Sequence, residues 1–179
     1  MNDVLVPSQL ATNPNRLASA DTTIRARLQR LQSLARRLEP HGQTAFLLLM
    51  RSLYGWFFIQ SGFGKWMHFD RTTAFFASLH LPAPAANAAL VATFELLGGI
   101  LVALGAGTRY ASAVLTIVLC TAYATAHAED AFKSLSAFTE QPPFPFLVAT
   151  LLLLAFGAGR VSVDGWWRAR GEASRASRV

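Results

Sequence analysis

The sequence has little capacity for covalent or metal crosslinks and carries little charge. A single cysteine, Cys120, excludes an internal disulfide and any cysteine-based metal cluster. Only 15% of the residues are charged, whereas 53% are hydrophobic. The chain contains no nucleotide-binding loop, haem-ligand pair or flavin motif, so catalysis by this chain alone is not expected. Redox chemistry would require a bound cofactor or the cofactor of a partner.

The composition is typical of a small membrane protein that crosses the bilayer several times. The chain has 179 residues, a mean hydropathy of +0.34 and an isoelectric point near 10.4. Nucleic-acid binding is the competing explanation of the high isoelectric point. The arginines, however, lie in the two tails that flank apolar runs and form no patch interleaved with aromatic residues. We therefore expect a lipid bilayer as the partner and no nucleic acid.

Four apolar runs predict the fold, an all-α membrane protein with a bundle of four transmembrane helices. The runs cover residues 44–66, 85–104, 110–126 and 146–159. The first is about as long as the roughly 20 residues that a hydrocarbon core requires, and the fourth is short enough to need help from its flanks. Gly98 and Gly99 in the second run are expected to let neighbouring helices approach closely. The transmembrane domain is assigned to residues 44–164.

The remaining segments are polar or basic. Residues 1–20 are predicted to be a disordered tail, and residues 165–179 a basic cytoplasmic tail. Residues 21–40 predict an amphipathic, arginine-rich helix that Pro40 and Gly42 end. This helix is expected to lie on the anionic cytoplasmic surface and to fix orientation, and a partner-binding helix is the alternative.

The distribution of arginine predicts the orientation. Nearly all loop arginines lie in the amino-terminal segment, in the link at Arg109 and in the carboxyl tail. Cytoplasmic loops carry this excess, so both termini are expected to be cytoplasmic. Four spans agree with this orientation, because an even number of crossings leaves both termini on the same side of the membrane.

Two charges inside the apolar runs suggest a buried ion pair. Arg51 is expected roughly 10 Å from the cytoplasmic side and Glu95 roughly 13 Å from it, so the two would lie at nearly one level. An Arg51–Glu95 pair would offset much of the desolvation of each group. The pair is expected to fix helix packing, with a role in handling protons or substrate as the alternative.

The outer level is the candidate binding site. Lys65 lies at the far end of the first run, His127 lies at the outer end of the third helix, and an aromatic loop, residues 68–87, is expected to fold back over them. A lysine and a histidine there can bind an anion or the carbonyl oxygens of a quinone, with His127 exchanging a proton. The full set of candidates is Lys65, His127, Tyr123, Cys120 and His68. The ordinary alternative is a lysine reaching the headgroups and a histidine at the interface, without a ligand. No metal site is expected, because the histidines and acids show no recognised ligand spacing.

Several motifs together resemble the DoxX family of small four-helix bacterial membrane proteins. The resemblance covers about residues 46–164. It rests on Arg51 with the following FFIQSGFGKW, the LPAP turn, FELLGGILVALGAGTRYAS, the late His127 and the closing GAGRVSVD. The chain departs from the family pattern at His80, where a glycine is expected before the Leu-Pro turn.

The resemblance implies an inner-membrane location and a link to redox chemistry. Members of the family are associated with membrane oxidoreductases, notably thiosulfate:quinone oxidoreductase, and with oxidative or thiol stress. The family-like polar positions are Arg51, Lys65, Glu95, Arg109 and His127. We expect a subunit or accessory of a quinone-linked oxidoreductase, with a protein partner or homo-oligomer, no intrinsic cofactor and quinone as the candidate ligand. A membrane scaffold is the alternative, and a small-solute transporter ranks below both.

Overall fold

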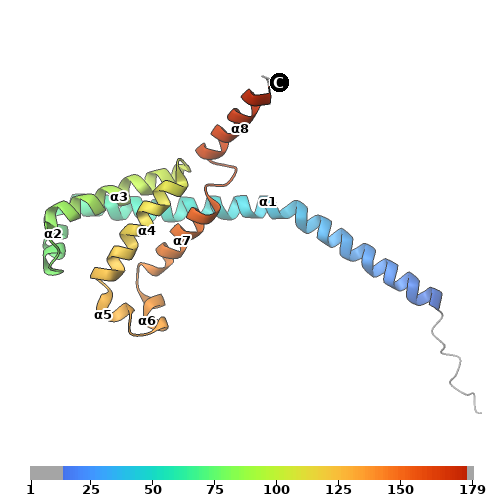
Figure 1. The fold of residues 1–179 in the computed structure, drawn as a ribbon, viewed down its shortest axis with the longest axis horizontal. Coiled ribbons are helices and arrows are strands. Elements are labelled where there is room, and N and C mark those ends of the chain that lie inside the picture. The colour runs from blue at the N-terminus through green and yellow to red at the C-terminus, as the bar shows by residue number, and fades with distance from the viewer. Residues whose placement is uncertain (1–13, 177–179) are drawn as a thin grey trace, which may run out of the picture. The chain divides into compact units, whose positions relative to one another are not determined.

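The protein is represented by a computed structural model that describes the backbone of residues 14–176 and the side chains of residues 29, 42–171, 174 and 175. Within the described backbone, every regular element is a helix (Figure 1), which confirms the all-α class. The chain divides into two compact units, residues 1–42 and residues 43–179. The candidate site lies within the second unit.

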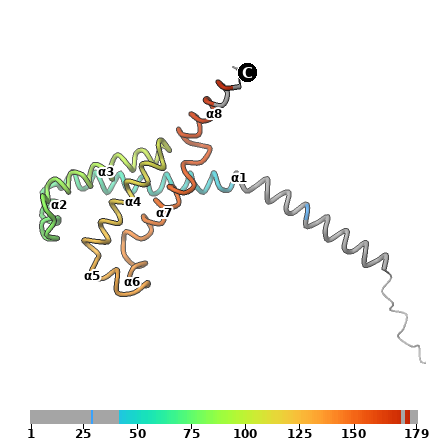
Figure 2. The backbone as a smooth tube through the Cα atoms, viewed as in Figure 1, coloured from blue at the N-terminus to red at the C-terminus, as the bar shows by residue number. Residues whose placement is uncertain are grey.

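The helices follow one another closely along the chain. They are α1 (Pro14–Met67), α2 (Phe69–Ser78), α3 (Pro84–Leu104), α4 (Thr108–Thr125), α5 (Ala128–Ala131), α6 (Leu135–Glu140), α7 (Phe144–Phe156) and α8 (Val163–Ala176). In Figure 2, α3, α4 and α7 run as neighbouring segments, and α4 contacts both of the others. The four apolar runs therefore correspond to the later part of α1, to α3, to α4 and to α7.

The boundaries at both ends of the chain differ from those expected. Residues 14–20 are helical rather than a disordered tail, and α1 does not end at Pro40 and Gly42. A proline removes only one backbone hydrogen bond, and the apolar run that follows it favours helix on its own account. Residues 1–13 of the predicted tail lie outside the described residues. The basic carboxyl tail forms α8 as far as Ala176.

Glycines bring α1 and α3 into close contact. A Cβ atom at Gly62 would lie only 2.7 Å from the carbonyl oxygen of Ala92, and one at Gly99 would lie 2.8 Å from that of Gly55. No larger residue fits such an approach without moving the backbone. The second glycine of the pair, Gly98, faces α4 instead, where a Cβ would lie 2.9 Å from Cγ of Leu115. The packing role expected for Gly98 and Gly99 is confirmed, with one glycine for each neighbouring helix.

Among the described helices, one is long and apolar enough to cross a membrane by length and composition. It is α3, with 21 residues and a mean hydropathy of 1.9. The apolar helix α7 has 13 residues, about 20 Å of helix, and is shorter than a hydrocarbon core of about 30 Å. Length and composition therefore support one of the four expected spans directly.

The segment after α1 folds back, as the sequence predicts. Helix α2 contacts α3 and lies across the end of the second unit, where α1 ends and α3 begins (Figure 1). Two residues in this turn adopt the left-handed conformation, His80 with φ 56° and Ala83 with φ 47°. That conformation favours glycine, which explains why a glycine was expected at His80.

Candidate functional site

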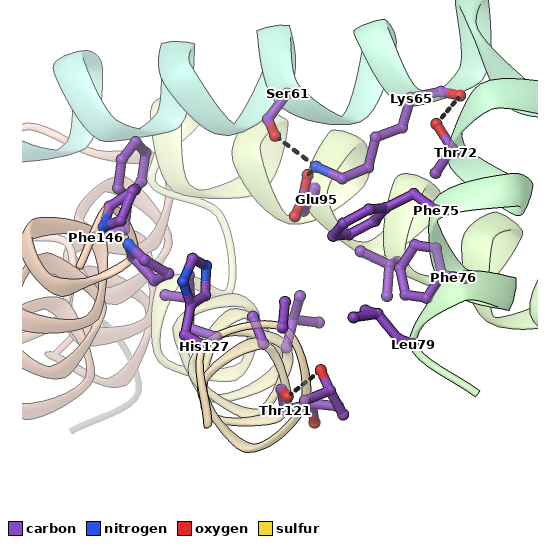
Figure 3. A pocket seen from close by; sticks show the side chains of 18 of the residues that line it. Ser61, Lys65, Thr72, Phe75, Phe76, Leu79, Glu95, Thr121, His127 and Phe146 are labelled. Atoms are coloured by element: carbon purple, nitrogen blue, oxygen red, sulfur yellow. Dashed lines mark hydrogen bonds and ion pairs between the residues drawn. The ribbon is translucent and has the colours of Figure 1, made fainter. Parts of the chain in front are cut away.

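A pocket of about 500 Å³ lies at the end of the second unit where α1 and α4 end and α3 and α7 begin. Its walls come from α1, α2, α3, α4 and the start of α7. Most of the lining is apolar, and four phenylalanines contribute to it: Phe58, Phe75, Phe76 and Phe146. Figure 3 shows Phe75 and Phe76 reaching into the pocket from α2, with His127 on another wall. The aromatic fold-back therefore forms one wall of the site.

Lys65 and Glu95 form an ion pair on the wall of this pocket. Lys65 Nζ lies 2.5 Å from Glu95 Oε2, and the same Nζ donates a hydrogen bond to Ser61 Oγ at 2.7 Å (Figure 3). The Lys65 side chain is 27% exposed and that of Glu95 10%. An ammonium group has three N–H donors, so these two bonds leave one for a ligand. The pair presents a hydrogen-bond donor to the pocket while its net charge is zero.

The predicted pair of Arg51 with Glu95 is wrong. Arg51 is buried, and its guanidinium donates to the carbonyl oxygens of Ala158 and Val161, each at 2.8 Å. These carbonyls belong to the chain between α7 and α8. Arg51 therefore ties the later part of α1 to that connection.

The error came from the register of α1 against α3. Gly55 packs between Gly99 and Ala103, and Gly62 packs between Ala92 and Leu96, so Glu95 is level with a residue near position 61 of α1. That level is about ten residues, or roughly 15 Å, from Arg51. Arg51 instead lies beside Gly105, at the end of α3. The depths of Arg51 and Glu95 were counted from the expected ends of their apolar runs, and this count placed the two residues at the same level in error.

His127 has a defined orientation at the opposite wall. Its Nδ1 lies 2.8 Å from Gln141 Oε1, and Gln141 Nε2 donates to the carbonyl oxygen of Ala137. Because the Gln141 oxygen is an acceptor, Nδ1 of a neutral His127 carries the proton. Nε2 is then an acceptor. His127 lines the pocket, so its ring can accept a hydrogen bond from a ligand.

The other three predicted residues do not line the pocket. Tyr123 is buried, and its hydroxyl donates to the carbonyl oxygen of Phe138 at 3.0 Å. Cys120 is exposed on α4. His68 is exposed and precedes α2, where its carbonyl oxygen accepts from the N–H of Thr72. Of the five candidates, the structure brings Lys65 and His127 to one pocket.

Sequence reasoning missed the polar residues that α1, α2 and α3 add to the pocket. Glu95 was assigned to a different partner, and Ser61, Arg71 and Thr72 were not considered. Thr72 donates to the carbonyl oxygens of Lys65 and His68 and so holds α2 against the end of α1. The spacing of Ser61 and Lys65, four residues apart on one helix face, was the signal that could have revealed their contact.

An exposed ion pair joins Asp130 of α5 to Lys133, just after that helix and away from the pocket. Lys133 Nζ donates to Asp130 Oδ1 at 2.6 Å. This hydrogen bond lowers the pKa of the Asp130 carboxyl and raises the pKa of the Lys133 ammonium. Both side chains are exposed, so the pair contributes little to stability.

Comparisons with known proteins identify the class. Residues 46–128 match the DoxX family. The chain belongs to the DoxX family, which is a family of membrane proteins. One relative is the protein named "Putative oxidoreductase CatD" of Bacillus subtilis (strain 168), which is 32% identical over 117 residues that cover 65% of this chain and 83% of that protein. No solved structure matches the chain.

Proposed function

We propose that this protein is a multi-pass protein of the bacterial inner membrane with four spans and both termini in the cytoplasm. The spans are the later part of α1 from residue 44, α3, α4 and α7. Membership of a membrane family and the length and hydropathy of α3 support this arrangement. The excess of arginine around Arg109 and in α8 supports the orientation. The pocket then lies in the outer half of the membrane.

The pocket is a binding site for a quinone. A quinone has a flat apolar ring with a carbonyl oxygen at each end. The pocket offers aromatic walls, a donor at Lys65 Nζ and a polar nitrogen at His127 on another wall. The observation that carries this proposal is that Lys65 and His127, 62 positions apart in sequence, line one largely apolar cavity.

The ion pair favours a neutral ligand over a small anion. Of the two cations in the lining, Lys65 is already balanced by Glu95 at 2.5 Å, and Arg71 is an exposed residue of α2. An anion entering the pocket would meet the Glu95 carboxylate as well as the Lys65 ammonium, and would lose its hydration in an apolar cavity. A carbonyl oxygen needs only the remaining N–H of Lys65.

The protein acts as a subunit or accessory of a quinone-linked membrane oxidoreductase. The oxidoreductase name of the Bacillus relative supports this class of function. Lys65 would hold one carbonyl oxygen of the quinone. His127 Nε2 would accept a hydrogen bond from the hydroxyl of the reduced form. Electrons would pass to or from the partner.

The test is a titration of the purified full chain with a short-chain quinone. Saturable binding is expected, and Lys65→Ala and His127→Ala should each weaken it about tenfold, the effect of losing one hydrogen bond to a buried polar group. His68→Ala is the matched control, because His68 lies near the same end of α1 but outside the pocket. Equal affinities in all four proteins would contradict the quinone site.

A membrane scaffold for a partner protein is the second candidate. The close glycine contacts between α1 and α3 favour it, because they serve rigid packing rather than chemistry. On this view a specific partner protein would co-purify with the chain. Lys65→Ala would then complement a deletion fully.

A further inference from the structure

A second cavity, of about 400 Å³, lies at the other end of the second unit, where α3 and α7 end and α4 begins. We call it the basic cavity. Its lining combines two arginines with aromatic side chains and one carboxylate: Arg109, Arg168, Tyr110, Phe156, Trp167 and Asp164. None of these residues lines the quinone pocket. The basic cavity is therefore a separate feature of the fold.

Each arginine is held in place by one hydrogen bond to a backbone carbonyl. Arg109 Nη2 donates to the carbonyl oxygen of Ala155 at 3.1 Å, and Arg168 Nε donates to that of Asp164 at 3.2 Å. A guanidinium has five N–H donors. These bonds orient both groups at the cavity while leaving donors for an anion.

The Asp164 carboxylate in the cavity already accepts hydrogen bonds from the backbone. Asp164 Oδ1 accepts from the N–H of Gly107 at 2.7 Å, and Oδ2 accepts from the N–H of Thr108 at 3.0 Å. Asp164 thus caps the start of α4, where the helix dipole is positive. Its charge is largely offset there, so the two arginines keep the cavity basic.

Exposed aromatic side chains line the same cavity. Tyr110 is 83% exposed, Trp167 70% and Phe156 57%. Tyrosine and tryptophan concentrate at the headgroup level of membranes, where one part of the ring is apolar and another is wet. Arginines beside such rings match the phosphate of a lipid headgroup and the glycerol and acyl chains below it.

We propose that the basic cavity binds the phosphate group of an anionic membrane lipid, with Arg109 and Arg168 as its ligands. Tyr110, Trp167 and Phe156 contact the apolar part of that lipid. The proposal rests on the membrane placement given above and not on the quinone site. A lipid fits better than free phosphate because half of the named lining is aromatic and exposed, which free phosphate does not use. The bound lipid would join α4, α7 and α8.

The test is native mass spectrometry of the full chain, purified in mild detergent, stripped of lipid and then mixed with one probe at a time. The probes are phosphatidylglycerol, phosphatidylcholine with the same acyl chains, and inorganic phosphate. The variant is Arg109→Gln/Arg168→Gln. The matched control, Arg170→Gln/Arg175→Gln, removes the same charge from exposed positions of α8 outside the cavity.

The wild type should retain one phosphatidylglycerol in preference to phosphatidylcholine. The cavity variant should bind it on the order of tenfold more weakly, whereas the control should change by less than about threefold. Equal losses in both variants would indicate diffuse surface charge and overturn the proposal. Displacement of the lipid by millimolar inorganic phosphate would assign the cavity to free phosphate and overturn it too.

A second readout separates this proposal from the quinone site. The cavity variant should bind a short-chain quinone like the wild type, and Lys65→Ala should retain phosphatidylglycerol like the wild type. If the double variant loses helical structure, Arg168→Gln alone replaces it, since Arg168 is an exposed residue of α8. Unchanged lipid affinity in a folded variant overturns the proposal whatever the quinone titration gives.

Discussion

Lys65 at the end of α1 and Glu95 in α3 form an ion pair with an Nζ to Oε2 distance of 2.5 Å. The contact joins residues 30 positions apart and lies on the wall of the proposed quinone pocket. It ties the end of α1 to α3 and balances the charge that Lys65 brings to the pocket. The ligand meets a neutral pair rather than an isolated ammonium.

Removing one member of the pair should cost more than removing both. Lys65→Met leaves a nearly buried carboxylate without its partner, and Glu95→Gln leaves the ammonium without its counter-charge. Each single variant should lose about 1–3 kcal/mol of unfolding free energy, and the double variant should recover part of it. Thermal unfolding in detergent measures this cycle. Strictly additive losses would show that the pair is not coupled.

Arg51 should be essential for stability independently of Glu95. Arg51→Gln removes two hydrogen bonds from a buried guanidinium to the Ala158 and Val161 carbonyls, so a loss of about 3 kcal/mol is expected. Adding Glu95→Gln should not restore stability, because Glu95 does not contact Arg51. Arg109→Gln, at an exposed arginine with one backbone bond, should cost less than about 1 kcal/mol. Rescue of Arg51→Gln by Glu95→Gln would restore the pairing inferred from the sequence.

Two glycines of α1, Gly62 and Gly64, lie two positions apart and provide a matched test of helix packing. Gly62→Ala places a methyl group 2.7 Å from the Ala92 carbonyl oxygen and should destabilise the protein by about 2 kcal/mol or more. Gly64→Ala meets no atom within 4 Å and should stabilise α1 by up to about 1 kcal/mol through helix propensity. Melting temperatures of the two variants should move in opposite directions. A shared direction would argue against close packing of α1 on α3.

The turn before α3 carries strain that a glycine should relieve. His80 has φ 56°, and His80→Gly should raise the unfolding free energy by up to about 1 kcal/mol without changing quinone binding, since His80 does not line the pocket. Leu81→Gly, at the next residue, has no positive φ to relieve and should lower stability. Thermal unfolding compares the two. A stability loss in His80→Gly would indicate that the His80 imidazole stabilises the fold by more than its backbone strain destabilises it.

The fold was largely predictable because hydrophobic runs act locally. The four runs match the later part of α1, α3, α4 and α7, and the aromatic segment after residue 67 folds back as α2. The helix through Pro40 was not predictable from local signals, because a proline can end a helix or be accommodated within one. The family resemblance, stated from the same residues, was confirmed.

The candidate site was predictable in part. Lys65 lies near the end of α1 and His127 directly after α4, and the alternating direction of α1, α3 and α4 places both residues at one end of the bundle. The partner of each charge was not predictable, because it depends on the register of α1 against α3. Gly55 and Gly62 set that register through contacts of a few ångströms, which no periodicity in the sequence encodes.

The measurement that tests the central claim most directly is mass spectrometry of the small molecules extracted from protein purified in mild detergent. Wild type, Lys65→Ala/His127→Ala and the His68→Ala control are compared at equal protein amounts. We predict quinone in the wild type and in the control, and its loss from the double variant. Equal quinone in all three proteins, or none in the wild type beside a specific partner protein, would contradict the quinone site and favour the scaffold.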